Sequence, residues 1–360
     1  MKHDVKGVSP RPAYERELMS APTRAATGAR RAMRYDLDIV ATRGTILESR
    51  HRVHAAVADE RGDLIGAAGD PSLVTAWRSC AKPIQSASFV AAGMLDAAAW
   101  GDDELALACA SHAGEPEHVA IAMRMLESLG LEEGDLACGP HEPLSKRGSK
   151  LLKESGEHPS RLHNNCSGKH AAMLAHAVHS GSGALGYDRA AHPVQQSVLA
   201  MVSRWTGIPN SKVLIAVDGC GVATFGLPLE AMASAFARFA SAADRGEEVP
   251  QRVLEAMRSR PFLVGGTDRF DTVLLEETQG EVIAKVGAEG VHCVAIPAMR
   301  VGFAIKVEDG AQRAQYAAVI RLLQYLGILP DELPPRLAGF ARSPVMNTRG
   351  ETVGELAPLA

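Results

Sequence analysis

The stretch GEVIAKVGAEGVHCVAIPAMRVGFAIKVEDGA, residues 280–311, decides the fold class of this chain. Its apolar and polar residues alternate, and Gly or Pro interrupts the alternation at short intervals. This pattern is typical of an antiparallel meander of β-strands. The helical pattern AQRAQYAAVIRLLQYLGI (311–328) follows, with apolar residues on one side, so we expect a helix that packs on the sheet.

A second strand-like region lies far away in the sequence, at residues 36–68, where β-branched runs are broken by RG and ERGD turns. Between the two regions, residues 79 to about 260 show mostly helical spacing of apolar residues. The economical arrangement joins the two strand regions in one antiparallel sheet. We therefore predict an α+β fold with a sheet lobe (36–75 and 260–360), a mainly helical lobe (76–259) and a small-molecule site between them.

Composition excludes several classes of protein. The 360 residues carry a net charge of −4 and only 4% aromatic residues, which argues against nucleic acid as a partner. No apolar run is long enough for a transmembrane helix. Residues 1–34 are rich in Arg, Pro and Gly, so we expect a disordered basic tail. The tail has no apolar core of a signal peptide, and none of the six cysteines forms a CxxC pair. We therefore expect a reduced, cytoplasmic protein.

The stretch AWRSCAKPIQSASFVAAG (76–93) contains the first candidate for chemistry, Ser79 with Lys82. If an α-helix begins near Ser79, residues three apart share one face, and Pro83 falls in the first turn. The positive end of a helix disfavours an ammonium, and a neutral amine can take a serine proton. About one S-x-x-K spacing is expected by chance in a chain of this length. A surface lysine in a first helical turn is therefore the alternative.

Two further motifs strengthen the interpretation of Ser79 and Lys82 as a nucleophile with its base. Serine β-lactamases and penicillin-binding proteins combine S-x-x-K with a K-T-G strand. In this chain, IAKVGAEG places Lys285 at the end of an apolar strand, and CASHAGE places Ser111 at a helix end, where it could relay protons or orient Ser79. The late motif reads K-V-G, and position 113 is Ala where S-x-N would need Asn. The resemblance to those enzymes is therefore one of architecture.

The ordered motifs ESRHRVH, WRSCAKPIQ, CASHAGEPEH, HNNCSGKHAAML, DGCGV, GGTDRFDT and KVGAEG are similar to those of another family, the asparaginase II family of Rhizobium etli type (class 3 L-asparaginases). The resemblance covers about residues 36–345. It implies hydrolysis of L-asparagine to L-aspartate and ammonia, a β-lactamase-like fold and a homodimer. It also implies two facing pairs, Ser79 with Lys82 and Ser111 with Lys285.

The same resemblance implies a zinc ion on Cys166, Lys169 and Cys220, with water as a further ligand. Cys166 and Lys169 are three residues apart at a helix start, so both could face one point. Thiolates suit zinc, whereas a lysine amine is an unusual ligand. From the residues alone, Cys166 and Cys220 could equally be two unrelated cysteines.

Asparagine carries an ammonium and a carboxylate, and a selective pocket must pair both. Arg78 is the candidate for the carboxylate, although a solvated arginine before a helix is the alternative. Arg269 and Thr272 are weaker candidates. Asn165, His170 and Asp218 flank the metal ligands in sequence and are expected near the substrate. For His170 and Asp218, a helix histidine and a turn aspartate are the alternatives.

Three functions stay open at this stage. The first is an L-asparaginase in which neutral Lys82 activates Ser79 and Ser111 with Lys285 protonates the leaving ammonia. The second is a serine-dependent glutaminase or a β-lactam-reactive hydrolase, because one methylene separates the two amides and is worth only about 1–3 kcal/mol. The third is a non-catalytic protein that binds an amino acid or zinc.

Overall fold

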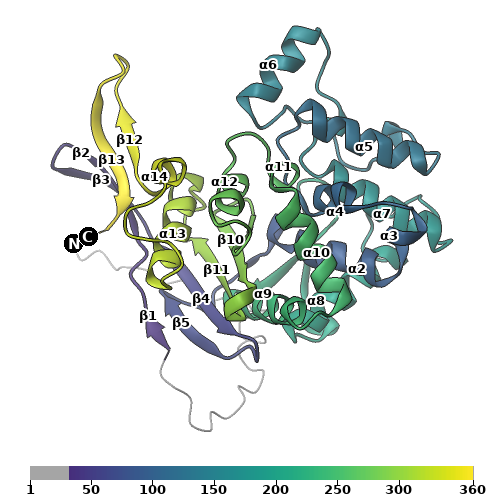
Figure 1. Ribbon diagram of the computed structural model, residues 1–360, viewed down its shortest axis with the longest axis horizontal. Coiled ribbons are helices and arrows are strands. Elements are labelled where there is room, and N and C mark those ends of the chain that lie inside the picture. Colours follow the sequence, from purple (N-terminus) through teal and green to yellow (C-terminus); the bar gives the residue numbers. More distant parts are fainter. Residues whose placement is uncertain (1–31, 360) are drawn as a thin grey trace, which may run out of the picture. The chain divides into compact units, whose positions relative to one another are not determined.

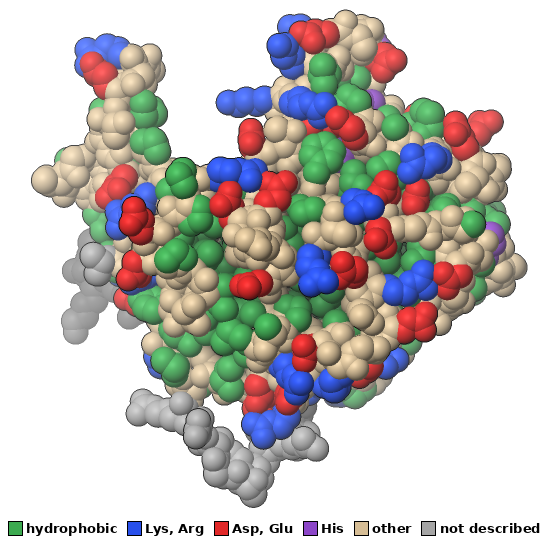
Figure 2. Space-filling view, in the orientation of Figure 1, with side chains coloured by type: hydrophobic (Ala, Val, Ile, Leu, Met, Phe, Trp, Pro, Cys, Tyr) green, Lys and Arg blue, Asp and Glu red, His purple; other side chains and the backbone are tan. Residues whose placement is uncertain are grey.

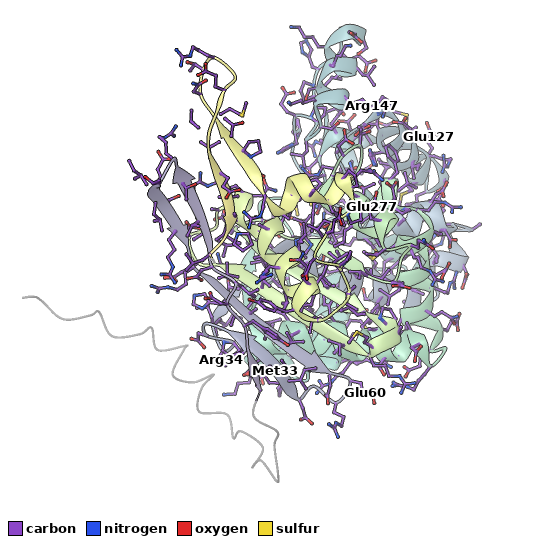
Figure 3. All side chains as sticks on the ribbon, turned by 60° about the vertical axis from the view of Figure 1, so that its left-hand side comes forward. Met33, Arg34, Glu60, Glu127, Arg147 and Glu277 are labelled. Atoms are coloured by element: carbon purple, nitrogen blue, oxygen red, sulfur yellow. The ribbon has the colours of Figure 1, made fainter. Side chains whose placement is uncertain are left out.

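The computed structural model describes residues 32–359. Residues 1–31, most of the predicted basic tail, lie outside the described residues. Met33–Arg34 form a short strand, β1, labelled in Figure 3, which pairs with Gly66 and Ala67. The predicted tail therefore extends two residues too far, because residues 33 and 34 belong to a sheet.

The largest sheet joins the two distant strand regions, as predicted. Its order is β1-β5-β4-β11-β10-β9, and all neighbours are antiparallel except β1 and β5 (Figure 1). The junction lies between β4 and β11, where Ala56 is opposite Ala304. The further strands of this sheet are β4 (Val53–Asp59), β5 (Leu64–Ala68), β9 (Ile283–Val286), β10 (Val291–Ile296) and β11 (Val301–Val307). Strand β9 lies at the edge.

Helices cover both faces of this sheet. On β11, Phe303 and Ile305 join the apolar cluster of α13 (Gln312–Tyr325), whereas Ala304 joins the cluster of α9 (Leu229–Asp244). This alternation is the two-residue period of a strand. Gly302 faces α9, and a Cβ there would lie 2.3 Å from Ala237 N. The close approach of α9 to the sheet therefore requires glycine at this position.

The strands that follow β1 along the chain, β2 and β3, belong to a second sheet, which corrects the expectation of a single one. Its order is β12-β13-β2-β3, formed by β12 (Ser343–Met346), β13 (Thr352–Pro358), β2 (Ile39–Arg43) and β3 (Ile46–His51). Strands β12 and β13 were not predicted, because their alternation is short and half exposed. Beside them, Leu359 N donates to Asp38 O at 2.8 Å. The C-terminal end of the described fold therefore lies beside Asp38, directly before β2.

The predicted helical region also contains a small sheet, β6-β8-β7, which the sequence did not indicate. Its strands are β6 (Val74–Ala76), β7 (Leu214–Val217) and β8 (Ala223–Pro228). The helices are α2 (Lys82–Ala91), α3 (Met94–Ala97), α4 (Asp102–Cys109), α5 (Pro116–Ser128), α6 (Lys146–Ser155), α7 (Ser167–His179), α8 (Pro193–Thr206), α10 (Glu248–Ser259), α11 (Pro261–Val264), α12 (Phe270–Glu277) and α14 (Pro335–Ala341). Short 3₁₀ turns are η1 (Arg78–Ala81), η2 (Glu133–Asp135), η3 (Arg161–His163), η4 (Asn210–Lys212) and η5 (Pro297–Met299).

The elements together make a mixed α+β protein. Acidic and basic side chains are interspersed on the face shown in Figure 2. Within residues 32–359, no helix has the length and apolar character that a membrane span requires. All six cysteines are buried and free.

Candidate active site

The first candidate pair lies where β6 leads into α2. Arg78 has a φ of 51°, and the 3₁₀ turn η1 then carries Ser79 before α2 begins at Lys82, with Pro83 in its first turn. The expected α-helix thus starts three residues later than Ser79. The Ser79 residue is half-buried, whereas Lys82 is buried.

The hydrogen bonds of Lys82 go to residues other than its predicted partner, Ser79. Its Nζ donates to Ser111 Oγ at 3.1 Å, to Asn165 O at 3.1 Å and to Ala110 O. No hydrogen bond found in the described part of the chain joins it to Ser79. Three acceptors match the three N–H groups of an ammonium. The contacts of Lys82 are therefore to Ser111 and to two backbone carbonyl groups.

Lys285 reaches the same hydroxyl from the other side. Its Nζ donates to Ser111 Oγ at 2.9 Å and to Val286 O at 2.8 Å, and the side chain is fully buried. Burial lowers the pKa of Lys285 to about 8, against the charge of Asp271 and together with that of Lys82. The pair of Lys82 and Lys285 can therefore lose one proton near pH 8.

Ser111 is the hydroxyl that both lysines share. It lies two residues beyond the end of α4, its backbone N–H is held by Val264 O at 3.2 Å, and only 4% of it is exposed. The structure therefore brings Lys82, Ser111 and Lys285 together as one chain of hydrogen bonds. Ser79 lies outside that chain of bonds and is more accessible than Ser111.

The three predicted metal ligands also converge. Cys166 is the N-cap of α7, Lys169 follows in the first turn, and Cys220 lies in the turn between β7 and β8. Lys169 Nζ lies 3.0 Å from Cys220 Sγ. A hydrogen bond from the Cys166 thiol and the charge of Lys169 outweigh burial and lower the pKa of Cys220 to about 4. Cys220 is therefore a thiolate.

These donors fit zinc in part. A thiolate and a nearby thiol are the sulfur ligands that zinc prefers, and the lysine amine is a less common third donor. Residues 32–359 contain no cluster of three or more Cys, His, Asp or Glu side chains with ligand spacing. A zinc site here would therefore depend on Lys169 as a ligand.

Two predicted binding residues pair with each other. Arg78 Nε donates to Asp218 Oδ1 at 2.9 Å, and the Arg78 side chain is 26% exposed. Burial opposes ionisation of Asp218, but the charges of Lys169 and Arg78 outweigh it and lower the pKa of Asp218. The pair links the Ser79 turn to the Cys220 turn, so a cation with free N–H groups lies between the two candidate centres.

Asn165 and His170 lie on the α7 side. Asn165 Oδ1 is 3.3 Å from Cys166 Sγ, and its carbonyl accepts from Lys82. His170 is fully buried, with Nδ1 2.6 Å from Tyr187 Oη, and burial lowers the pKa of His170 to about 3. His170 is thus a neutral ring beside the thiol cluster.

The motif GGTDRFDT contributes differently from what the sequence suggested. Thr272 Oγ1 accepts from Gly266 N at 3.1 Å and lies 3.2 Å from Pro261 O, so this side chain holds its own loop. Arg269 caps α12 and is half-buried. The residue that approaches the lysines is Asp271, whose Oδ2 lies 4.0 Å from Lys285 Nζ. Sequence reasoning missed Asp271, although it lies in a quoted motif.

A second buried carboxylate was also missed. Glu115, whose side chain is fully buried, accepts from Thr267 N at 2.9 Å and Thr267 Oγ1 at 2.8 Å, and it pairs with Arg147, labelled in Figure 3. It ties the loop that carries Ser111 to the loop before α12. Its place at the end of CASHAGE, directly before a helix, was the available signal.

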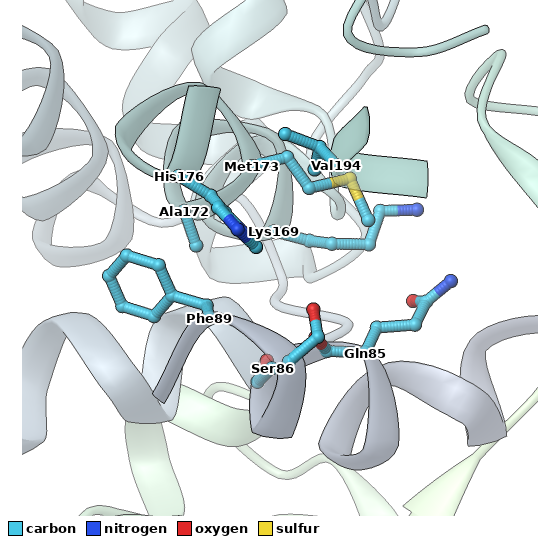
Figure 4. Close-up of a pocket in the computed structure, with 9 residues that line it drawn as sticks. Gln85, Ser86, Phe89, Lys169, Ala172, Met173, His176 and Val194 are labelled. Carbon is cyan, nitrogen blue, oxygen red and sulfur yellow. The ribbon is translucent and has the colours of Figure 1, made fainter. Parts of the chain in front are cut away.

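A small pocket lies between α2 and α7 (Figure 4). Its lining includes Gln85, Phe89, Lys169 and His176. Neither Ser79 nor Ser111 lines it. Lys169 is therefore the one residue that it shares with the candidate centres. It is not the space in which a substrate would meet Ser79.

The fold and these clusters define a mixed α+β protein with a buried serine and two lysines. The sequence model of the family described as L-asparaginase II matches residues 39–358. The chain belongs to this family of asparaginase-like amidohydrolases.

The other comparisons were with curated proteins and with solved structures. No match was found among curated proteins. A crystal structure of Mglu is 14% identical with a TM-score of 0.42, covering 77% of this chain and 67% of that chain. The native form of Mglu in 4.3 M NaCl is 15% identical with a TM-score of 0.43, covering 77% and 61%. The chain thus spans about three fifths to two thirds of the length of these solved chains.

Proposed function

We propose that the protein is an L-asparaginase that hydrolyses L-asparagine to L-aspartate and ammonia, with Ser79 as the nucleophile. The observation that carries the proposal is the convergence of Lys82 and Lys285 on Ser111 Oγ, with Ser79 three residues before Lys82 in the chain. A nucleophile must be reached by substrate, and Ser79 is the more accessible of the two hydroxyls. Ser111 is then the relay between the amines.

The proton path follows from the hydrogen bonds. Both amines contact Ser111 Oγ, so once the pair has lost one proton this hydroxyl can pass the remaining one between them. Ser111 can give its hydroxyl proton to Lys285 Nζ and receive one from Lys82 Nζ, so one proton moves across without loss. Lys82 is then neutral and can take the proton of Ser79 as Oγ attacks the side-chain amide carbon.

Breakdown of the tetrahedral adduct requires a proton on the leaving nitrogen. The ammonium of Lys82 or, through Ser111, that of Lys285 supplies it, and ammonia departs to leave a β-aspartyl ester on Ser79. Water then attacks the ester carbon, with a neutral amine taking its proton, and L-aspartate leaves. In each step, the proton that one group gives up is taken by another group, and the lysines and Ser111 pass it between them.

The structure limits which backbone N–H groups could donate hydrogen bonds to the oxyanion of the tetrahedral adduct. The N–H of Val286 donates to Asp271 Oδ2, and that of Gly287 donates to Val291 O. The strand donor expected from KVGAEG is therefore neither of these. The backbone N–H of Ser79 and those of the turn after Gly287 are the remaining candidates.

Substrate charges would be paired near the Ser79 turn. Arg78 presents N–H groups beyond its bond to Asp218, and these suit a carboxylate. Asp218 is the acidic group beside it and suits the α-ammonium. Asn165 offers amide groups on the α7 side. Arg269 is kept as a weaker candidate.

Zinc is part of the proposal as a bound ion on Cys166, Lys169 and Cys220. When bound, it would hold the pocket in shape and attract the substrate carboxylate. A β-lactamase-like fold is supported by the antiparallel sheet between helices and the adjoining helical region. The homodimer and the cytoplasmic location stay predictions from the sequence.

The test is ammonia release from L-asparagine and, side by side, from L-glutamine, with wild type and Ser79→Ala. We expect asparagine to be preferred and the variant to lose turnover. Near-normal turnover by Ser79→Ala would remove Ser79 as nucleophile, and preference for glutamine would support the glutaminase alternative. Covalent labelling by a penicillin would support the β-lactam alternative. Zinc binding without ammonia release from either amide would support a binding protein.

A further inference from the structure

The site holds two lysines and one buried carboxylate that touches neither the substrate candidates nor the thiol cluster. We propose that Asp271, oriented by His292 and Gln315, is a positioning residue that draws the shared proton of the site onto Lys285. The inference rests on the proposed function, because it assigns which lysine becomes the neutral base. Sequence reasoning had not assigned a role to Asp271.

Asp271 is held at the end of the strand that carries Lys285. It lies in the first turn of α12, is 3% exposed, and its Oδ2 accepts from Val286 N at 2.8 Å. Because β9 is the edge strand, this side chain takes a backbone N–H that no further strand could pair. The same oxygen is 4.0 Å from Lys285 Nζ. The bond to Val286 N fixes the carboxylate to strand β9, and the same carboxylate oxygen faces the Lys285 amine.

The second carboxylate oxygen is fixed from the sheet. His292, opposite Val286 on β10, places Nε2 3.0 Å from Asp271 Oδ1, and these two atoms have no other partner among the described residues. Gln315 Nε2 lies 3.3 Å from His292 Nδ1 and donates to Val291 O at 2.6 Å. Of the two ring nitrogens of His292, Nε2 is therefore the one that faces the carboxylate. The row Gln315, His292, Asp271 therefore points an anion at Lys285.

The charges around Lys285 are uneven. Asp271 on α12 is the acid that faces it, while Lys82 on α2 faces it through Ser111, and the thiols of Cys80 and Cys166 lie further around it. Burial opposes ionisation of Asp271, but His292, Lys285 and Val286 N–H outweigh it and lower the pKa of Asp271 to about 2. Asp271 is therefore an anion throughout the working range.

An anion beside one of two amines decides where a single proton resides. An opposite charge within about 4–6 Å favours the charged form of a group by about one to three pKa units. No carboxylate lies beside Lys82 in the hydrogen bonds and ion pairs of residues 32–359. With one proton between the lysines, Asp271 favours it on Lys285 and leaves Lys82 free to act on Ser79.

The test is titration of the Lys285 Nζ signal in protein labelled with ¹⁵N-lysine, assigned by its loss in Lys285→Met. In Asp271→Asn we expect the midpoint to fall by about one to three pH units, because the anion that favours the ammonium is gone. The matched control is Asp38→Asn, since Asp38 also accepts a backbone N–H (Val53, 2.9 Å) and pairs with a basic residue away from the site. The control should leave the midpoint unchanged.

Activity gives a separate readout. In Asp271→Asn, the plateau of kcat/KM for L-asparagine should fall at least tenfold and the acid limb should move to lower pH. An unchanged midpoint in folded Asp271→Asn, or an equal shift in Asp38→Asn, would overturn the proposal. If Asp271→Asn does not fold, the wild-type protein provides the test. The chemical shift of the Asp271 carboxyl carbon should then change at the pH at which Lys285 titrates. A chemical shift that stays constant there overturns the proposal. Failure of wild type to release ammonia would instead reject the proposed function, while the titration stands on its own.

Discussion

Lys82 and Lys285 approach the same oxygen, Ser111 Oγ, at 3.1 and 2.9 Å, one from a helix and the other from the edge strand of the sheet. Both amines are almost completely buried. Two ammonium ions this close repel each other strongly when little water screens them. The site therefore sheds one proton more readily than an isolated lysine would, and the hydroxyl lets the two amines share the other.

Removing the shared hydroxyl should break the exchange between the lysines. We expect Ser111→Ala to lower kcat for L-asparagine by about 10²–10⁴, the range of a lost proton-transfer group. Steady-state ammonia release measures it. Ser88→Ala is the matched control, because Ser88 is equally buried on α2 and bonds only to Gln85 O. Turnover within twofold of wild type in Ser111→Ala would contradict the relay.

Activity should rise with pH around the titration of Lys285. The pKa of Lys285 is lowered to about 8, so the pair holds both protons well below that pH and loses one above it. Since catalysis needs one neutral amine, kcat/KM should increase through about pH 8 and level off above it. The profile of ammonia release between pH 6 and 10 tests this. A profile that falls or stays level across pH 7–9 would be inconsistent with a lysine base.

The metal proposal can be tested without activity. Purified wild type should carry zinc, and Cys220→Ala should lose most of it, because the thiolate is the strongest donor of the set. Elemental analysis after dialysis gives the content. Cys109→Ala serves as control, since Cys109 is as buried as Cys220 but is located at the end of α4, outside the cluster. If wild type, Cys220→Ala and Cys109→Ala have equal zinc contents, the ion is not bound by Cys220.

The role proposed for Arg78 in binding the substrate predicts an effect on KM. Arg78→Lys keeps the charge but loses the planar fork that bonds Asp218 and would bond a carboxylate. We expect KM for L-asparagine to rise at least about tenfold, with a smaller change in kcat. Arg50→Lys is the control, because Arg50 Nε bonds Asp38 at 2.8 Å in the same way, away from the site. If both variants behave alike, Arg78 does not contact the substrate.

One prediction concerns the fold. Gly302→Ala would place a Cβ 2.3 Å from Ala237 N and 2.6 Å from Ala233 O, both backbone atoms of α9. We expect a loss of about 1–3 kcal/mol or more in the free energy of unfolding. Denaturant unfolding measures it, with Gly339→Ala as control, because a Cβ there meets nothing within 4 Å. Unchanged stability of Gly302→Ala would show that α9 can move away from the sheet.

Much of the fold was accessible from the sequence, because the strand regions 280–311 and 36–68 and the amphipathic helices have clear periods. The union of β4 with β11 and the packing of α13 were predicted. The second sheet was not, because the half-exposed strand β12 shows too short an alternation. Strands β7 and β8 were hidden by the surrounding helices, and only the turn at Cys220 between them was anticipated.

The site was predictable in its residue types and less so in its pairing. Spacing placed Ser79 and Lys82 on one helical face, but the 3₁₀ turn moves Ser79 off α2 and turns Lys82 toward Ser111. The sequence identified GGTDRFDT, yet it could not say which side of α12 faces the lysines. Thr272 therefore looked like a ligand for substrate, and Asp271 was overlooked.

The meeting of Leu359 N with Asp38 O at 2.8 Å has a consequence for engineering. If a short linker joined Leu359 to the segment before Asp38, the polypeptide could be cut at the loop around Leu185, which is 98% exposed, without separating any neighbouring strands. Such a circularly permuted enzyme would begin and end among the helices. The hydroxyls and amines of its candidate active site would keep the same neighbours although their order along the chain had changed.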